Sequence, residues 1–190
     1  MRNNNKKENN CGFIINNMIT KLSITNFRNF KSLYIKRLSL INTISGANQS
    51  GKTSILDYIH KTIETPSTLN DKDRTFTIVN DSHLFCPSPM ANKILLIDEI
   101  EKGLYYTSYK DILSTILKNA YQNQIQTFIT THSKEILETL LGILKENLKY
   151  QEKYYHHILA ANIKGKICVY SHNYNESVGI AKGTFDLRGG

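Results

Sequence analysis

The residues most able to do chemistry lie in the segment ISGANQSGKTSIL, residues 44–56. Gly46 and Gly51 enclose four residues, and Lys52 and Thr53 follow directly. Glycines at this spacing let the backbone curl so that successive N–H groups point inward at phosphate oxygens. Lys52 would then reach the β- and γ-phosphates, and Thr53 would place its hydroxyl on Mg²⁺. The pattern predicts a phosphate-binding loop.

Two further groups of polar residues stand at the ends of apolar runs. Asp98 and Glu99 follow ILLI, residues 94–97, and His132 lies near the end of IQTFITTHS, residues 125–133. Ligands of open α/β sheets bind outside the carboxyl ends of the strands, so these side chains would meet the loop there. Asp98 would hold Mg²⁺ and Glu99 would take a proton from an attacking water. His132 would hydrogen-bond a γ-phosphate or position that water.

The elements around the loop have clear patterns. The alternating runs ITKLSITNF and SLYIKRLSL predict two strands, paired as a hairpin across Arg28 and Asn29. A third strand, roughly residues 40–44, would lead into the loop. Apolar residues at helical spacing after Lys52 predict a helix there. The loop would therefore stand between a strand and a helix, which is the context that this motif needs.

The rest of the chain alternates between predicted strands and predicted helices. The run ILLI is typical of a strand buried on both faces of a parallel sheet. A helix over 107–121, a strand over 125–133 and a helix capped by Ser133 would follow. A hairpin turning near Lys164 and Gly165 would follow those elements. The expected fold is α/β: a mostly parallel sheet flanked by helices, with an antiparallel hairpin at its N-terminal end.

The Asn- and Lys-rich residues 1–17 show no period and are expected to form a disordered tail, with Met18 a candidate for the true start. Residues 18–190 would form a single domain. Within it, residues 64–93 form a shortened insert that is mostly loop, with a short strand at 75–79. His156 and His157 have no metal-ligand partner at a useful spacing and are interpreted as strand residues.

The composition of the chain limits the classes of function that fit it. The formal net charge is +8, which indicates either attraction to DNA or a composition that has drifted towards lysine, because the lysines are scattered. No run approaches the roughly 18 apolar residues that a membrane span needs. Three widely spaced cysteines fit reduced thiols in the cytoplasm. The tyrosine pairs 105–106 and 154–155 are interpreted as packing residues.

These residues together carry a family resemblance. The run ITKLSITNFRNFKSLYIKRLSLINTISGANQSGKTSIL resembles the N-terminus of the RecF, SMC and OLD-like group of ABC-type ATPases. The phrase ILLIDEIEKGLYY is similar to the Walker B and D-loop region of OLD-like, AAA_21-type proteins. FITTHSKEIL resembles their switch-histidine strand with its following helix, and GTFDLRGG is similar to the ending of several of them.

The resemblance implies a nucleotide site with assigned roles. Asp98 would be the Walker B aspartate and a Mg²⁺ ligand together with Thr53. Glu99 would be the catalytic base, and His132 the switch histidine. ATP would be the nucleotide, held by residues of the loop and of the first hairpin: Gly46, Ala47, Asn48, Gln49, Ser50, Gly51, Lys52, Thr53, Ser54, Arg28 and Asn29.

The chain departs from that family between its two nucleotide motifs. Relatives carry a long insert there, with a Q-loop glutamine and a helical lobe whose glycine-containing signature closes over the ATP of a second subunit. Between Lys52 and Lys102 this chain has neither Gly nor Gln, and position 105 is Tyr where relatives often have His. We therefore expect slow hydrolysis, or hydrolysis that depends on a homodimer or a partner chain supplying the missing donors.

Two other functions stay open at this point. The first is a nucleotide sensor that binds ATP without hydrolysing it and acts as an interaction module. The second is a basic DNA-binding protein whose nucleotide site is vestigial.

Overall fold

The computed structural model describes residues 18–64, 75–79, 93–147 and 154–183. The expectations for the tail, residues 1–17, and for most of the insert, residues 64–93, lie outside these residues. The strand predicted within the insert is present as β4 (Thr75–Val79). No helix among the described residues is long and apolar enough to cross a membrane.

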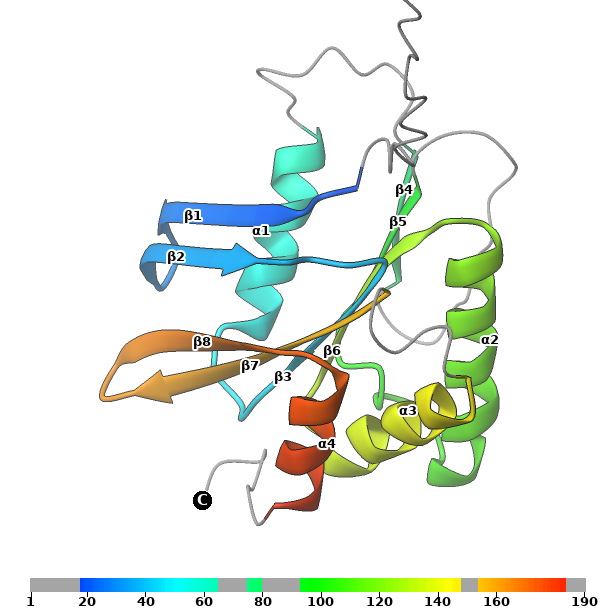
Figure 1. The fold of residues 1–190 in the computed structure, drawn as a ribbon. Coiled ribbons are helices and arrows are strands. Elements are labelled where there is room, and N and C mark those ends of the chain that lie inside the picture. Colours follow the sequence, from blue (N-terminus) through cyan, green and yellow to red (C-terminus); the bar gives the residue numbers. More distant parts are fainter. Residues whose placement is uncertain (1–17, 65–74, 80–92, 148–153, 184–190) are drawn as a thin grey trace, which may run out of the picture.

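A six-stranded sheet forms the centre of the molecule (Figure 1). Its order is β4–β5–β6–β3–β7–β8. The first five strands run parallel, and β8 pairs antiparallel with β7. The expectation of a mostly parallel sheet is therefore confirmed. Besides β4, the sheet contains β3 (Ile41–Ser45), β5 (Lys93–Ile97), β6 (Gln126–Thr131), β7 (Tyr155–Ile163) and β8 (Lys166–His172).

The predicted N-terminal hairpin is also present, and it forms a separate two-stranded antiparallel sheet of β1 (Lys21–Phe27) and β2 (Phe30–Lys36). Its turn is Arg28–Asn29, as expected. One face of the hairpin is apolar and buried, since Ile24 and Ile35 are fully or almost fully covered. Alternation of burial along both strands follows from the two-residue period of a strand with one buried face.

Helices cover both faces of the central sheet (Figure 1). The first, α1 (Lys52–Glu64), packs with the hairpin on one face. The other face carries α2 (Tyr109–Gln122), preceded by a 3-10 turn η1 (Tyr106–Ser108), together with α3 (Lys134–Glu146) and α4 (Tyr174–Lys182). Each face has its own apolar cluster, so the central strands are buried on both sides and need not alternate.

The helix boundaries follow local capping. The Ser133 hydroxyl accepts the N–H of Ile136 at 3.3 Å, which confirms the expected cap of α3. The last helix, α4, was not expected from periodicity. Its start is marked by a capping box, in which the Asn173 side chain accepts the N–H of Glu176 and the Glu176 carboxylate accepts the N–H of Asn173.

Candidate functional site

The glycine loop stands between β3 and α1, where the sequence predicts it. Gly46 has φ +146° and Gly51 has φ +91°, both in the region that side chains with a Cβ rarely adopt. A Cβ on Gly46 would lie 2.0 Å from the carbonyl oxygen of Ala160 on β7. A Cβ on Gly51 would lie 2.9 Å from the ring of Phe30 on the hairpin. The surrounding strands therefore leave room for backbone alone at both positions.

Lys52, the first residue of α1, is folded back over the loop. Its side chain is 5% exposed, and its ammonium donates to the carbonyls of Gly46 at 2.8 Å and Ala47 at 2.7 Å. Burial lowers the pKa of Lys52, and the nearby carboxylates of Glu99, Glu101 and Asp98 oppose this shift. An ammonium has three donors, so one remains available for a ligand above the loop.

The loop forms the floor of a cavity of about 450 Å³. Side chains from three other parts of the chain complete it: the hairpin turn, the end of β5 and the end of β6. The Ser50 hydroxyl is buried here and has no hydrogen-bond partner among the described residues. The lining residues are Asn29, Asn48, Gln49, Ser50, Gly51, Lys52, Thr53, Ser54, Glu99 and His132.

Asp98 is fixed beside the loop by two hydroxyls. Thr53 donates to its carboxylate at 3.0 and 3.2 Å, and Thr130 on β6 donates at 2.5 Å. The carboxylate and the Thr53 hydroxyl are oxygen ligands of the kind that Mg²⁺ prefers. The sequence pattern missed Thr130, because only the pairing of β5 with β6 brings it next to Asp98.

Glu99 lines the cavity and is held by two contacts. Its N–H donates to the Thr130 hydroxyl at 2.7 Å, and its carboxylate pairs with the Lys102 ammonium at 2.6 Å. The hydrogen bond from Lys102 is the main reason that the pKa of Glu99 lies below its usual value. Its backbone φ of +47° is unusual for a residue with a side chain, as is frequent at functional sites.

His132 lines the same cavity and is anchored by Glu101, which sequence reasoning missed. The Glu101 carboxylate accepts the backbone N–H of His132 at 2.7 Å. The same oxygen lies 2.8 Å from His132 Nδ1, a close contact without hydrogen-bond geometry. The only sequence signal for Glu101 was its place three residues after Asp98, on the turn that follows β5.

The two hairpin residues predicted to bind nucleotide have different positions. Asn29 lines the cavity. The guanidinium of Arg28 instead pairs with Asp57 on α1 and lies 5.7 Å from the Phe27 ring centre. Arg28 is not among the residues that line the cavity, and its role in nucleotide binding stays a prediction.

Behind the loop, β7 buries His156 and His157, which were expected to be strand residues. Ser45, the last residue of β3, lies 2.6 Å from His157 Nε2. His157 is fully buried and its ring centre is 5.7 Å from that of His172. Neither ring nitrogen of His156 has a partner among the described residues. Burial is the main cause that lowers the pKa of His156 to about 4 and that of His157 to about 3.

These histidines should make stability fall in mild acid. Their folded-state pKa values lie below the ordinary 6.5, so the unfolded chain binds more protons as the pH falls below 6.5. The contribution of the two histidines to the free energy of unfolding is therefore fully present at pH 7.5. At pH 5 the free energy of unfolding should be lower by about 4 kcal/mol for the two residues together. Denaturant unfolding at the two pH values measures this difference.

A histidine variant tests the cause of that loss. His156→Met removes one of the two buried titrating groups on β7. It should reduce the difference in unfolding free energy between pH 7.5 and pH 5 by about half. An unfolding free energy that is the same at pH 5 and pH 7.5 would show that the buried imidazoles do not control acid stability.

Comparison with known proteins gives two family matches and one curated relative. The AAA_15 family, an AAA ATPase domain, matches residues 18–86. The AAA_21 family, an AAA domain linked in its description to the AbiEii toxin and type IV toxin–antitoxin systems, matches residues 74–138. The DNA replication and repair protein RecF of Desulforamulus reducens is 37% identical over 65 residues. That match covers 34% of this chain and 18% of RecF.

Among solved structures, the Legionella pneumophila ATPase DotB aligns with a TM-score of 0.45 and 14% identity. The alignment covers 76% of this chain and 52% of DotB.

The strand–loop–helix unit, the parallel sheet and the two partial family matches are all similar to those of ATP-binding P-loop NTPase domains. Each family matches about a third of the chain, and the RecF match covers a similar share, so the chain is similar in part to AAA ATPase domains and to RecF.

Proposed function

We propose that the chain is a Mg²⁺-dependent ATPase of the ABC/OLD-like type whose turnover is slow or depends on a partner. The observation that carries this proposal is the convergence of Lys52, Glu99 and His132 on one cavity, with Asp98 bonded to Thr53 at its side. These residues come from three parts of the chain, and a purely structural loop does not need them together. The cytoplasm, which supplies ATP and keeps thiols such as Cys168 reduced, is the proposed location.

The loop residues hold the phosphates in this proposal. Backbone N–H groups of residues 46–54 and the start of α1 face the anion, because the first N–H groups of a helix lack partners within it. The remaining donor of Lys52 and the unpartnered hydroxyl of Ser50 supply side-chain contacts. Asn29, together with Arg28 after release from Asp57, contacts the nucleotide from the hairpin.

Thr53 and Asp98 would hold Mg²⁺, which would supply positive charge to neutralise the phosphates. Their hydroxyl and carboxylate oxygens are the kind of ligand that suits this ion. The hydrogen bond from Thr130 orients the Asp98 carboxylate towards Thr53.

Glu99 takes the proton from the attacking water, and His132 positions the γ-phosphate or that water. A carboxylate paired with Lys102 is a weak base, because the pairing lowers its pKa. Release of the Lys102 ammonium therefore raises the basicity of Glu99 and is a step that a partner can control. The donors that relatives contribute from a signature segment must also come from a second copy or another chain.

Replacement of Lys52 tests the nucleotide site. Lys52→Ala should weaken Mg·ATP binding about tenfold to a hundredfold, because a charge-assisted contact to phosphate is lost. Calorimetric titration measures the affinity, and light scattering on the same samples shows whether ATP drives dimerisation. Lys118→Ala, an exposed lysine on α2, is the matched control and should bind as the wild-type chain does.

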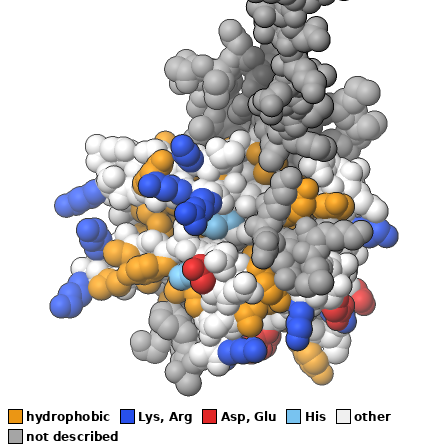
Figure 2. Space-filling model, viewed as in Figure 1, with side chains coloured by type: hydrophobic (Ala, Val, Ile, Leu, Met, Phe, Trp, Pro, Cys, Tyr) orange, Lys and Arg blue, Asp and Glu red, His pale blue; other side chains and the backbone are white. Residues whose placement is uncertain are grey.

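A second candidate is DNA binding, which a basic surface favours. Lys21 and Lys36 stand directly opposite each other on the exposed face of the hairpin, although like charges at such positions are unfavourable. Lys and Arg side chains line the side of the molecule formed by the hairpin and β7–β8 (Figure 2). Salt-dependent binding to duplex DNA that neither ATP nor Lys52→Ala changes would favour this function over the ATPase.

A further inference from the structure

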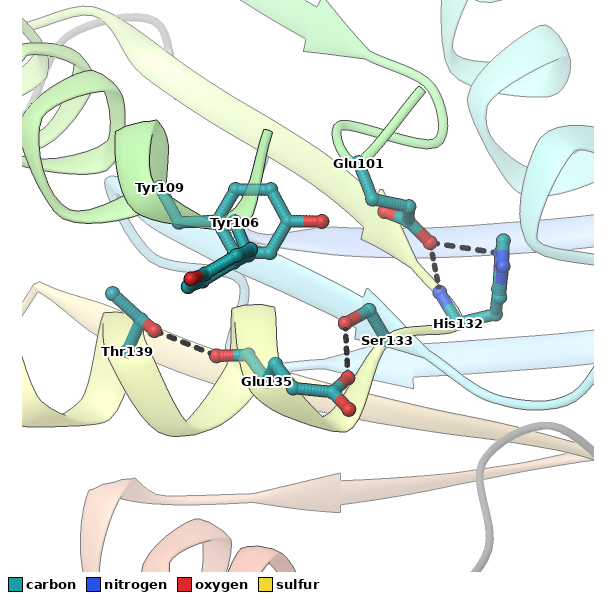
Figure 3. A pocket seen from close by; sticks show the side chains of 7 residues that line it. All are labelled: Glu101, Tyr106, Tyr109, His132, Ser133, Glu135 and Thr139. Atoms are coloured by element: carbon teal, nitrogen blue, oxygen red, sulfur yellow. Dashed lines mark hydrogen bonds and ion pairs between the residues drawn. The ribbon is translucent and has the colours of Figure 1, made fainter. Parts of the chain in front are cut away.

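A second cavity lies beside the nucleotide loop, and its walls are acidic and aromatic (Figure 3). It has a volume of about 740 Å³, which is in the range of ligand pockets. Among the described residues that line it there is no lysine or arginine, although the chain as a whole carries a formal charge of +8. The lining residues are Glu101, Tyr106, Tyr109, His132, Ser133, Glu135 and Thr139.

Glu101 brings an unsatisfied oxygen to this cavity. Its side chain is 9% exposed, and its Oε1 atom accepts the backbone N–H of His132. Its Oε2 atom is buried and has no hydrogen-bond partner among the described residues. A buried carboxylate oxygen without a donor is costly, so this atom indicates a cationic or strongly donating ligand.

The opposite wall offers aromatic faces. Tyr106 is 78% exposed and its neighbour Tyr105 is 81% exposed, so the interpretation of this pair as packing residues is wrong. Tyr109 lies deeper, and its pKa is raised first by burial and then by the negative charges of Glu101 and Glu135. The cavity therefore combines a negative electrostatic potential with exposed aromatic rings.

We propose that this cavity binds an arginine side chain presented by a partner protein. A guanidinium combines the two properties that the walls require, since its planar fork donates to carboxylates and its face stacks on aromatic rings. It would donate to Glu101 Oε2, lie against Tyr106 and stay within the field of Glu135.

The cavity shares a residue with the nucleotide site. His132 lines both cavities, and Glu101 holds its backbone and contacts its ring. A guanidinium bound to Glu101 Oε2 would draw on the same carboxylate whose other oxygen, Oε1, holds His132, and would so weaken that hold. This coupling rests on the proposed ATPase function. By linkage, arginine binding and Mg·ATP binding should change each other's affinity by the same factor.

The test uses a fluorescein-labelled peptide, Ala-Leu-Arg-Leu-Ala, and the matched peptide with citrulline, which is neutral and nearly the same shape. Fluorescence anisotropy without nucleotide measures binding to the full chain. We expect the arginine peptide to bind at least about tenfold more tightly than the citrulline peptide. Glu101→Gln and Tyr106→Ala should each weaken it about tenfold, while Tyr170→Ala, an exposed tyrosine on β8, should not.

Several outcomes would overturn the proposal: no saturable binding of the arginine peptide, equal affinity for both peptides, or full affinity in Tyr106→Ala. A dimer that forms without peptide and is lost in Glu101→Gln would assign the cavity to a second copy instead. The binding is repeated with saturating Mg·ATP and in Lys52→Ala. An arginine affinity that ATP leaves unchanged, although ATP binds, would overturn the coupling alone; failure of ATP to bind would overturn the proposed function and not the arginine site.

Discussion

The Glu99→Gln variant should hydrolyse ATP about 10²–10⁴ times more slowly than the wild-type chain while binding it with unchanged affinity. Glutamine keeps the shape of Glu99 but cannot take a proton from water. The residue lines the nucleotide cavity, and its N–H contact with Thr130 is a backbone contact that the substitution retains. Single-turnover measurement of phosphate release is needed, because the wild-type rate is itself expected to be low.

Glu138→Gln provides the matched control, since it makes the same chemical change at an exposed position on α3. Its rate should equal that of the wild-type chain. Equal and negligible turnover in the wild-type chain and in Glu99→Gln would instead support the non-hydrolysing nucleotide sensor. In that case ATP binding would still set the shape of the protein, and Lys52→Ala would still weaken that binding.

Replacement of Gly46 by alanine should abolish ATP binding and lower the stability of the folded chain by about 3 kcal/mol or more. The added Cβ would lie 2.0 Å from the Ala160 carbonyl oxygen, and the backbone φ of +146° is one that alanine rarely adopts. Because a backbone atom blocks the methyl group, the loop or β7 must move, and the phosphate-binding curve of the loop is lost. Calorimetric titration and denaturant unfolding measure the two effects.

Gly142→Ala separates this clash from a general effect of alanine. Gly142 lies within α3, and a Cβ there would meet no atom within 4 Å. Alanine is the better helix former, so this variant should be more stable by about 0.5–1 kcal/mol and bind ATP normally. Normal ATP binding by Gly46→Ala would mean that the loop does not need a bare backbone against β7.

The sequence determined the features that neighbouring residues specify together. The glycine spacing with Lys52 and Thr53 gave the loop and its place between strand and helix, and the apolar run before Asp98 gave a buried parallel strand. The hairpin turn at Arg28 and Asn29 and the cap at Ser133 were also correct. Periods of two and 3.6 residues and capping residues act within one element, so they can be read without knowing what the element packs against.

Other features of the site depend on which strands become neighbours. The register of β5 against β6 brings Thr130 to Asp98 and Glu99, and the turn after β5 brings Glu101 to His132. The acidic and aromatic cavity exists only because this turn, η1 and the start of α3 meet.

The residues that surround the loop could not be predicted from the sequence pattern either. Only the packing of β3 against β7 puts the Ala160 carbonyl against Gly46 and His157 against Ser45. The sequence therefore predicted which residues can hold a phosphate, a metal ion and a proton. The tertiary structure decided which side chains hold those residues in place, because hydrogen bonds between distant residues depend on strand order and register, which no short stretch of sequence contains.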